Sequence, residues 1–163
     1  MMATVQKITP CLWFDHQAEE AAKYYVEIFP NSKITQVSRY LQETFGKPAG
    51  SVLTVAFELA GQSFTGLNGG PVFQFTEAIS LQVMCDDQKE VDHYWEKLGA
   101  GGDPQAQQCG WLKDKFGVSW QIVPKAMIEM IASPQTDKAL HAMQAMMQMK
   151  KLDIAALEKA FAG

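Results

Sequence analysis

The feature that most constrains this chain is an order of elements that occurs twice. Residues 8–68 and residues 79–123 each read as a strand, then a helix, then further strands. The strand- and helix-like segments are, in order, residues 8–14, 17–29, 33–40, 51–59, 62–68, 79–83, 88–98, 105–113 and 118–123. This order predicts two similar modules that pack against each other, an arrangement that usually keeps a ligand between the modules.

Apolar residues at helical spacing support both predicted helices. The first helix has one apolar face, formed by Ala18, Ala21, Ala22, Tyr25, Ile28 and Phe29. We expect Asp15 to cap its start, and Pro30 ends it. The second helix carries an apolar stripe formed by Val91, Tyr94, Trp95 and Leu98. Asp86 or Asp87 is placed to cap this helix, and Gly99 to stop it.

Alternation of apolar and polar residues gives each predicted strand two unlike faces. In the second module, Ile79, Leu81 and Val83 alternate with polar residues, and so do Val118, Trp120 and Ile122. If the apolar members pack against the helices, four short polar side chains line the opposite, concave surface: Ser80, Gln82, Ser119 and Gln121. The same argument predicts that Trp13 and Trp120 lie under the helices. The turn at 114–117 joins two strands, with Gly117 at its positive-φ position.

The pattern changes after Pro124, where residues 125–132, 137–149 and 153–161 read as helices. The middle helix is rich in methionine, with Met143, Met146, Met147 and Met149. Methionine fills irregular cores and interfaces. We expect these side chains to pack within the domain or in a homodimer, and a hydrophobic ligand surface is the alternative.

Size and charge exclude several classes of function. The chain has 163 residues, which suits one compact domain, and its net charge of −4 gives no basic field for nucleic acid. The sequence has no apolar run near the roughly 20 residues of a membrane span and no signal-peptide pattern. Three widely spaced cysteines, Cys11, Cys85 and Cys109, fit a reduced cytoplasmic protein better than a disulfide scaffold.

The sequence offers one candidate nucleophile. Cys109 precedes Gly110 and Trp111 and is the cysteine nearest the expected concave face. A reactive thiolate needs a histidine or a cation beside it. None of the three histidines is placed to help, so a small buried thiol is the main interpretation and a reactive one the alternative. Cys11 and Cys85 lie in strand-like segments and are expected in the core.

Metal and nucleotide motifs are not found in the sequence. It has no His-Glu-x-x-His, His-x-His or Cys-x-x-Cys spacing. The glycines between Leu98 and Asp103 follow a helix and precede a predicted strand, whereas cofactor-binding glycine loops follow a strand and open a helix. They are interpreted as a helix stop. We expect no cofactor.

Three motifs carry a resemblance to a known family. They are Leu12-Trp13-Phe14-Asp15 with the helix that follows, Leu67-Asn68-Gly69-Gly70-Pro71, and Lys113-Asp114-Lys115-Phe116-Gly117-Val118-Ser119-Trp120-Gln121-Ile122. Over about residues 5–125 the chain resembles the PhnB-like family of the glyoxalase/bleomycin-resistance/dioxygenase (vicinal oxygen chelate) superfamily. Its members often carry the label 3-demethylubiquinone 3-methyltransferase. The resemblance implies an α+β fold with two βαβββ modules whose curved sheets enclose a cleft, commonly in a homodimer.

The resemblance also implies where a metal would sit in metal-dependent members of the superfamily. The four ligand positions fall on Pro10, Thr65, Ala78 and Gln121 in this sequence. None of these is a usual ligand of a divalent metal, although a glutamine oxygen can bind weakly. A shift of one position, to Thr9 or Cys11, does not restore a ligand set. We therefore expect no metal site.

Together these observations predict a single PhnB-like domain at residues 1–125, with modules 5–75 and 76–125 and a helical extension at 126–163. The expected function is metal-independent binding of a small organic molecule, with or without catalysis. The predicted ligand-binding residues are Ser63, Thr65, Ser80, Gln82, Ser119, Gln121 and Phe14, with Leu12 and Met84 as further apolar wall. A metal-dependent glyoxalase-like lyase or dioxygenase is one alternative, and an enzyme dependent on Cys109 is another.

Overall fold

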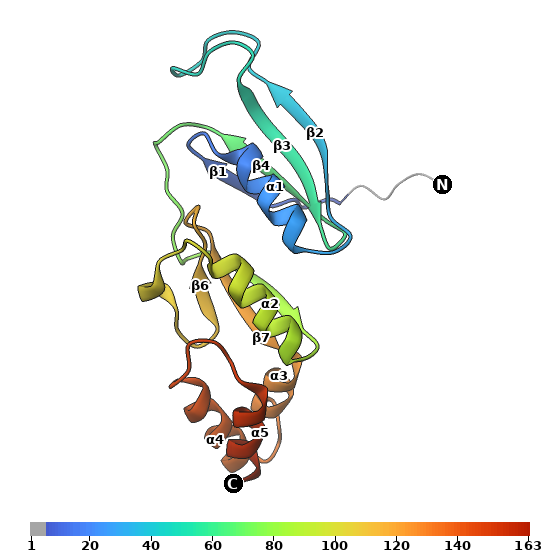
Figure 1. Ribbon diagram of the computed structural model, residues 1–163, viewed down its shortest axis with the longest axis vertical. Helices are drawn as coiled ribbons and strands as arrows, with labels where there is room; N and C mark the ends of the chain where they lie inside the picture. Colours follow the sequence, from blue (N-terminus) through green and yellow to red (C-terminus); the bar gives the residue numbers. More distant parts are fainter. Residues whose placement is uncertain (1–5) are drawn as a thin grey trace, which may run out of the picture. The chain divides into compact units, whose positions relative to one another are not determined.

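The computed structural model describes residues 6–163, and it divides the chain into two compact units (Figure 1). The first unit ends at Phe75 and the second runs from Thr76 to Gly163. Each unit has its own small sheet and a helix, and three more helices follow in the second unit. The α+β fold predicted from the sequence is confirmed.

The first unit is a four-stranded sheet in the order β1-β4-β3-β2. Its elements are β1 (Cys11–Phe14), α1 (Ala18–Ile28), β2 (Lys33–Arg39), β3 (Val52–Leu59) and β4 (Gln62–Asn68). β1 pairs with β4 in parallel, and the other pairs are antiparallel. Helix α1 lies along one face of this sheet (Figure 1). This is the βαβββ order predicted from the sequence.

Small residues on α1 allow the helix to lie close to the sheet. Ala18, Ala21 and Ala22 are fully buried, and Tyr25 stacks on Phe57 of β3 at a ring-centroid distance of 6.3 Å. A Cβ atom at Gly66 of β4 would lie 3.2 Å from the Ala18 Cβ atom. Glycine at this position therefore sets the approach of helix to strand.

The second unit has a three-stranded sheet in the order β5-β7-β6, with β5 parallel to β7. Its elements are β5 (Leu81–Cys85), α2 (Gln88–Gly99), a 3₁₀ turn η1 (Pro104–Ala106), β6 (Trp111–Lys113) and β7 (Ser119–Pro124). The Asp87 carboxylate caps α2 by accepting a hydrogen bond from the Glu90 backbone N–H at 2.8 Å, as predicted. Gly117 has a φ of 91° in the turn before β7, also as predicted.

The predicted strand at 105–113 is present only at its end, as β6, and the second sheet has three strands where the first has four among the described residues. Pro104 has no N–H to donate, and the Asp103 carboxylate accepts from the Gln105 N–H at 2.9 Å, which starts a 3₁₀ turn instead. Gln108 and Trp111 then form an antiparallel bridge. The two residues between them both have positive φ, 53° at Cys109 and 84° at Gly110. This geometry is that of a type I′ hairpin turn.

Three C-terminal helices form their own core: α3 (Lys125–Ile131), α4 (Thr136–Met146) and α5 (Ile154–Ala162). The buried members of this core are Val123, Met127, Met130, Ala142, Leu152 and Leu157. Met146 and Met149 pack against it, whereas Met143 and Met147 are exposed. The methionines of this region are thus divided between core and surface.

Hydrogen bonds from backbone groups and from one side chain hold the segment between α4 and α5 against the rest of the second unit. The Met149 and Lys150 carbonyls accept hydrogen bonds of 2.8 Å from the Cys109 and Gly110 N–H groups. On α2, the Gln88 side chain donates to the Leu152 carbonyl at 3.1 Å and accepts from the Ile154 N–H at 2.8 Å. We call residues 149–154 the C-terminal strap.

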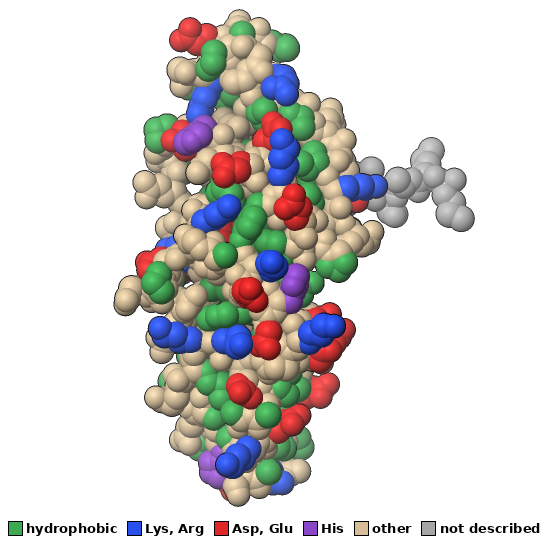
Figure 2. Space-filling model, in the orientation of Figure 1, with side chains coloured by type: hydrophobic (Ala, Val, Ile, Leu, Met, Phe, Trp, Pro, Cys, Tyr) green, Lys and Arg blue, Asp and Glu red, His purple; other side chains and the backbone are tan. Residues whose placement is uncertain are grey.

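Acidic and basic side chains are interspersed on the face shown in Figure 2, with no continuous basic area there. Among residues 6–163, no helix has the length and apolar character needed to cross a membrane.

Candidate functional site

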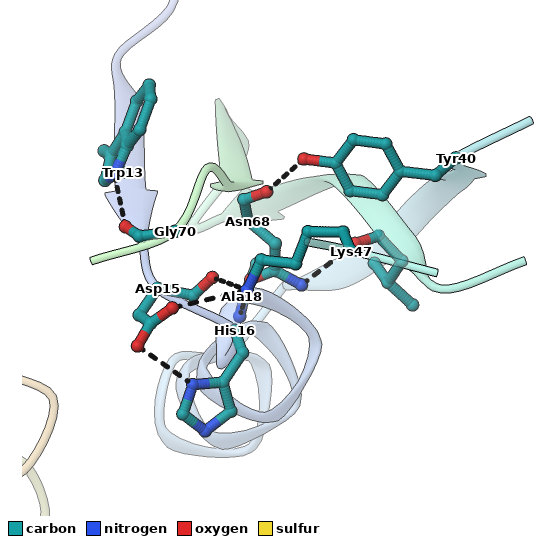
Figure 3. A network of polar contacts seen from close by, with 9 residues as sticks. Trp13, Asp15, His16, Ala18, Tyr40, Lys47, Asn68 and Gly70 are labelled. Atoms are coloured by element: carbon teal, nitrogen blue, oxygen red, sulfur yellow. Dashed lines mark hydrogen bonds and ion pairs between the residues drawn. The ribbon is translucent and has the colours of Figure 1, made fainter. Parts of the chain in front are cut away.

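The Leu67-Asn68-Gly69-Gly70-Pro71 motif is the centre of a polar network in the first unit (Figure 3). The Asn68 side-chain oxygen accepts a hydrogen bond of 2.8 Å from the Ala18 N–H, which is the first N–H of α1. The Asn68 amide nitrogen donates to the Val52 carbonyl at 3.1 Å, and the Tyr40 hydroxyl donates to the Asn68 carbonyl at 2.6 Å. Asn68 is 5% exposed, so these bonds join α1, β3 and the end of β2 inside the unit.

The glycines of this motif make room for Trp13. The Trp13 indole N–H donates to the Gly70 carbonyl at 2.9 Å, and a Cβ atom at Gly69 would lie 2.3 Å from the Trp13 ring. Trp13 therefore packs across the motif and contacts Phe73 edge-on at 4.9 Å. The prediction that Trp13 lies under a helix is wrong, because the glycine backbone offers it a flat surface on the other side of the sheet.

The prediction that Asp15 caps α1 is also wrong. The residue before the helix is Gln17, which makes no side-chain cap bond, and Asn68 satisfies the helix instead. Asp15 instead binds Lys47, which lies in the loop between β2 and β3. The Lys47 ammonium donates to the Asp15 carbonyl at 2.6 Å and to its carboxylate at 3.3 Å. His16 lies 3.5 Å from the same carboxylate (Figure 3).

The motif at residues 113–122 is built around a buried carboxylate. Asp114, 2% exposed, accepts hydrogen bonds from the Phe116 and Val118 N–H groups at 2.9 and 3.0 Å through one oxygen. Its other oxygen accepts from the Trp120 indole N–H at 2.8 Å. Trp120 is 2% exposed on the helix side of the sheet, as predicted. The motifs at residues 67–71 and 113–122 thus close turns and stabilise the fold.

The predicted polar residues of the second unit share the open face of its sheet, meaning the face opposite α2. Gln82 of β5 is level with Gln121 of β7, which is level with Trp111 of β6. The Gln82 amide donates to the Gln121 side-chain oxygen at 3.3 Å, and the Gln121 amide donates to the Ser80 hydroxyl at 2.7 Å. We call Ser80, Gln82, Ser119 and Gln121, with Trp111, the amide face.

Ser119 adds an unsatisfied group to this face. It lies two residues before Gln121 on β7 and is 2% exposed, and its hydroxyl has no hydrogen-bond partner among the described residues. Such a group costs about 1–3 kcal/mol unless a water or a ligand pairs with it. Val123, two residues after Gln121, belongs to the C-terminal core, so the amide face ends at the C-terminal helices.

The residues predicted in the first unit are divided between the two faces of its sheet. Ser63 and Thr65 of β4 lie on its open face, where Thr65 is level with Cys11 and with Ala56. Phe14 and Leu12 lie on the face covered by α1 and are 2% and 8% exposed. Placing Phe14 in a binding surface with Ser63 and Thr65 is therefore wrong, because successive residues of β1 point to opposite faces. Met84 is exposed at 41% on the same face as Gln82.

The cysteines differ from each other in exposure. Cys85 is fully buried, and burial with nearby carboxylates, Glu90 above all, raises the pKa of its thiol to about 12. Cys11 is exposed on the open face of the first sheet, which corrects its predicted place in the core. Cys109 is partly exposed at the type I′ turn that precedes Trp111.

Residues 6–163 contain no group of three or more His, Cys, Asp or Glu side chains that could hold a metal ion. At the position implied by the resemblance, Gln121 already binds Gln82 and Ser80. The glycines after Leu98 end α2, and a Cβ atom at Gly102 would lie 2.0 Å from the Lys113 carbonyl oxygen. Those glycines allow two backbone segments to meet.

Comparison with known proteins gives the same family for most of the chain. Residues 6–123 match the model of the 3-demethylubiquinone-9 3-methyltransferase family. A PhnB protein from Bacillus cereus is similar at 38% identity and a TM-score of 0.63, with 73% of this chain and 99% of that chain covered. No curated protein matches the chain.

Two more distant structures are also similar. Protein PA1353 from Pseudomonas aeruginosa has 18% identity and a TM-score of 0.54, with 74% of this chain and 98% of that chain covered. A glyoxylase/bleomycin resistance protein/dioxygenase domain from Frankia sp. has 14% identity and a TM-score of 0.47, with 74% of this chain and 93% of that chain covered. From the family match and the 38% identical PhnB protein, this chain belongs to the 3-demethylubiquinone-9 3-methyltransferase family, which is the PhnB-like family.

Proposed function

We propose that this PhnB-like protein binds an uncharged organic molecule on its amide face, without a divalent metal. The observation that carries the proposal is the row of linked side chains Ser80, Gln121 and Gln82 beside the unpartnered hydroxyl of Ser119. Amides and hydroxyls supply donors and acceptors without charge, which is the surface that holds neutral ligands in orientation. Ser63 and Thr65, on the open face of the first sheet, are proposed as ligand-binding residues of the first unit.

A metal-dependent lyase or dioxygenase is a poorer fit to these residues. Its ligand positions would be Pro10, Thr65, Ala78 and Gln121, of which only the hydroxyl and the amide carry a side-chain donor atom.

A ligand screen tests the proposal. Thermal unfolding of the full chain is followed against a library of metabolites and antibiotics, since a ligand that binds only the folded state raises the midpoint. Stabilising compounds are then tested on Gln121→Leu and on Gln36→Leu, a matched change at an exposed strand glutamine of the first unit. We expect stabilisation to be lost in the first variant and kept in the second.

Two outcomes count against the proposal. A library in which no compound stabilises the protein through Gln121 leaves the amide face without a ligand. Tight one-to-one binding of Ni, Zn, Mn or Fe, measured by elemental analysis of the purified protein and by divalent-ion thermal shifts, restores the metal-dependent alternative.

We also propose a cytoplasmic homodimer. Three cysteines without disulfides suit a reducing compartment. On α4 and the residue after it, Leu140, Met143 and Met147 are exposed by 50%, 38% and 54%, at the spacing of one helical face. Sedimentation of the full chain at micromolar concentration tests the dimer, and a monomer there contradicts it.

A further inference from the structure

The amide face has an aromatic member that the proposed function does not explain. Trp111 of β6 is level with Gln121 of β7, so their side chains leave the sheet side by side on the open face. Trp111 is partly exposed, and no ring contact or indole hydrogen bond joins it to the rest of the described chain. Trp120, in contrast, is buried and donates its indole N–H to Asp114.

Charge at the border of the face is already neutralised. Lys113, two residues after Trp111 and level with Ser119, points to the same face. Its ammonium lies 2.5 Å from the Glu77 carboxylate, and this hydrogen bond lowers the pKa of Glu77. A ligand carboxylate or phosphate would have to break this ion pair to find a cation, so the face favours molecules without a formal charge.

The hydrogen-bonding capacity that remains on the face is mixed. Gln82 keeps its side-chain oxygen as an acceptor and one amide N–H as a donor, because only the other N–H is used toward Gln121. The Ser80 hydroxyl accepts from Gln121 and can still donate its proton. Ser119 can do both. A ligand that satisfies these groups needs a donor and an acceptor close together, as an amide or a lactam has.

We propose that the amide face selects flat, uncharged heterocycles carrying an amide or lactam group, which stack on Trp111 while their N–H and C=O pair with Gln82 and Ser119. This inference rests on the proposed function and narrows it to one chemical class. A stacked aromatic contact contributes beyond the area it buries, and it requires a planar partner.

The test uses three small probes with the full-length protein. Quinolin-2-one is a planar neutral lactam, decahydroquinolin-2-one keeps the lactam without the flat ring, and quinoline-2-carboxylate keeps the flat ring with a negative charge. Dissociation constants come from titrations followed by ¹H–¹⁵N spectra, in which the Trp111 indole signal is assigned with Trp111→Phe. We expect quinolin-2-one to bind about tenfold tighter than either relative and to shift the Trp111 indole signal.

Variants separate stacking from simple exposure of a tryptophan. Trp111→Leu should weaken quinolin-2-one about fivefold or more, Trp111→Phe should lose less, and Trp95→Leu on α2 should change nothing. Should Trp111→Leu fail to fold, the comparison of Trp111→Phe with the wild type and the shift of the indole signal still decide the case.

The outcomes distinguish this inference from the function on which it rests. Equal binding of the planar and saturated lactams, or tighter binding of the carboxylate, overturns the preference for flat neutral heterocycles. If library compounds of another class still stabilise the protein through Gln121, the proposed function stands without this inference. If no compound does so, both are wrong.

Discussion

The side-chain oxygen of Asn68 accepts a hydrogen bond of 2.8 Å from the backbone N–H of Ala18, fifty positions earlier in the chain. The first N–H groups of a helix have no partner within the helix. Here a residue at the end of β4 satisfies one of them, so the helix start and the sheet depend on each other. The motif that contains Asn68 therefore links α1 to the sheet of the first unit.

Removing the Asn68 side chain should destabilise the protein. Asn68→Ala deletes the cap of α1 and leaves the Val52 carbonyl without its donor, so we expect a loss of about 2–3 kcal/mol in the free energy of unfolding. Chemical denaturation measures it. Gln62→Ala, at the exposed start of the same strand, is the control and should change stability little. A loss no larger than that of the control would show that water replaces Asn68 at no cost.

The contact between Gly69 and Trp13 predicts a mutation whose effect depends on its neighbour. Gly69→Ala places a methyl group 2.3 Å from the indole ring, so the ring must move and its bond to Gly70 must break. We expect a cost of about 1–3 kcal/mol in the wild type. In a Trp13→Leu background the same change should cost clearly less, because the smaller side chain leaves room. Equal costs in the two backgrounds would place the strain elsewhere.

The C-terminal strap predicts a link between α2 and the turn before Trp111. Gln88→Ala removes both side-chain bonds to the strap, which should release the carbonyls of Met149 and Lys150 from the turn. We expect faster hydrogen exchange at the Cys109 and Gly110 amides and a loss of about 1–2 kcal/mol in unfolding free energy. Lys89→Ala, the exposed neighbour on α2, should leave both quantities unchanged. Unchanged exchange in Gln88→Ala would mean that the strap is held by its packing against the C-terminal core alone.

Local patterns in the sequence predicted most of the elements. The apolar stripes of α1 and α2, the Asp87 cap and the turn glycine Gly117 all involve residues within a few positions of each other. Alternation along β5 and β7 likewise predicts that Ser80, Gln82, Ser119 and Gln121 share a face, since their register follows once those two strands pair.

Contacts between distant residues were not predictable in this way. Asn68 and Asp15 are both ordinary cap residues, and only the fold shows that the distant one caps α1. Trp13 was misplaced because its partners are the glycines 69 and 70, whose lack of side chains is what accepts the ring. The first part of the strand predicted at 105–113 forms a 3₁₀ turn instead, because the Asp103 carboxylate accepts a hydrogen bond from the Gln105 N–H. Assigning Trp111 to the amide face from the sequence would have required the bounds of β6, which is only three residues long.

The buried thiol of Cys85 gives a prediction in the alkaline range. Its pKa is raised from 9.0 to about 12 by burial and by the carboxylates of Glu90, Asp86 and Asp87. The unfolded chain therefore releases this proton at lower pH than the folded chain does. The stabilising contribution of the neutral thiol is complete below pH 9 and is lost as the pH rises toward 12. Denaturation midpoints at several pH values between 8 and 11 should fall more steeply for the wild type than for Cys85→Ala.

The same burial orders the reactivity of the three thiols. Iodoacetamide reacts with thiolates, and Cys85 combines full burial with a raised pKa, so it should remain unlabelled in the folded protein at pH 8. Cys11 is exposed, although burial of its thiol also raises its pKa, and it should react in the native state more slowly than a free thiol. Mass spectrometry of digests over time measures each site, and Cys109→Ser serves as the matched variant. Labelling of Cys109 far faster than that of Cys11 would favour a Cys109-dependent enzyme, whereas comparable slow labelling of both argues against one.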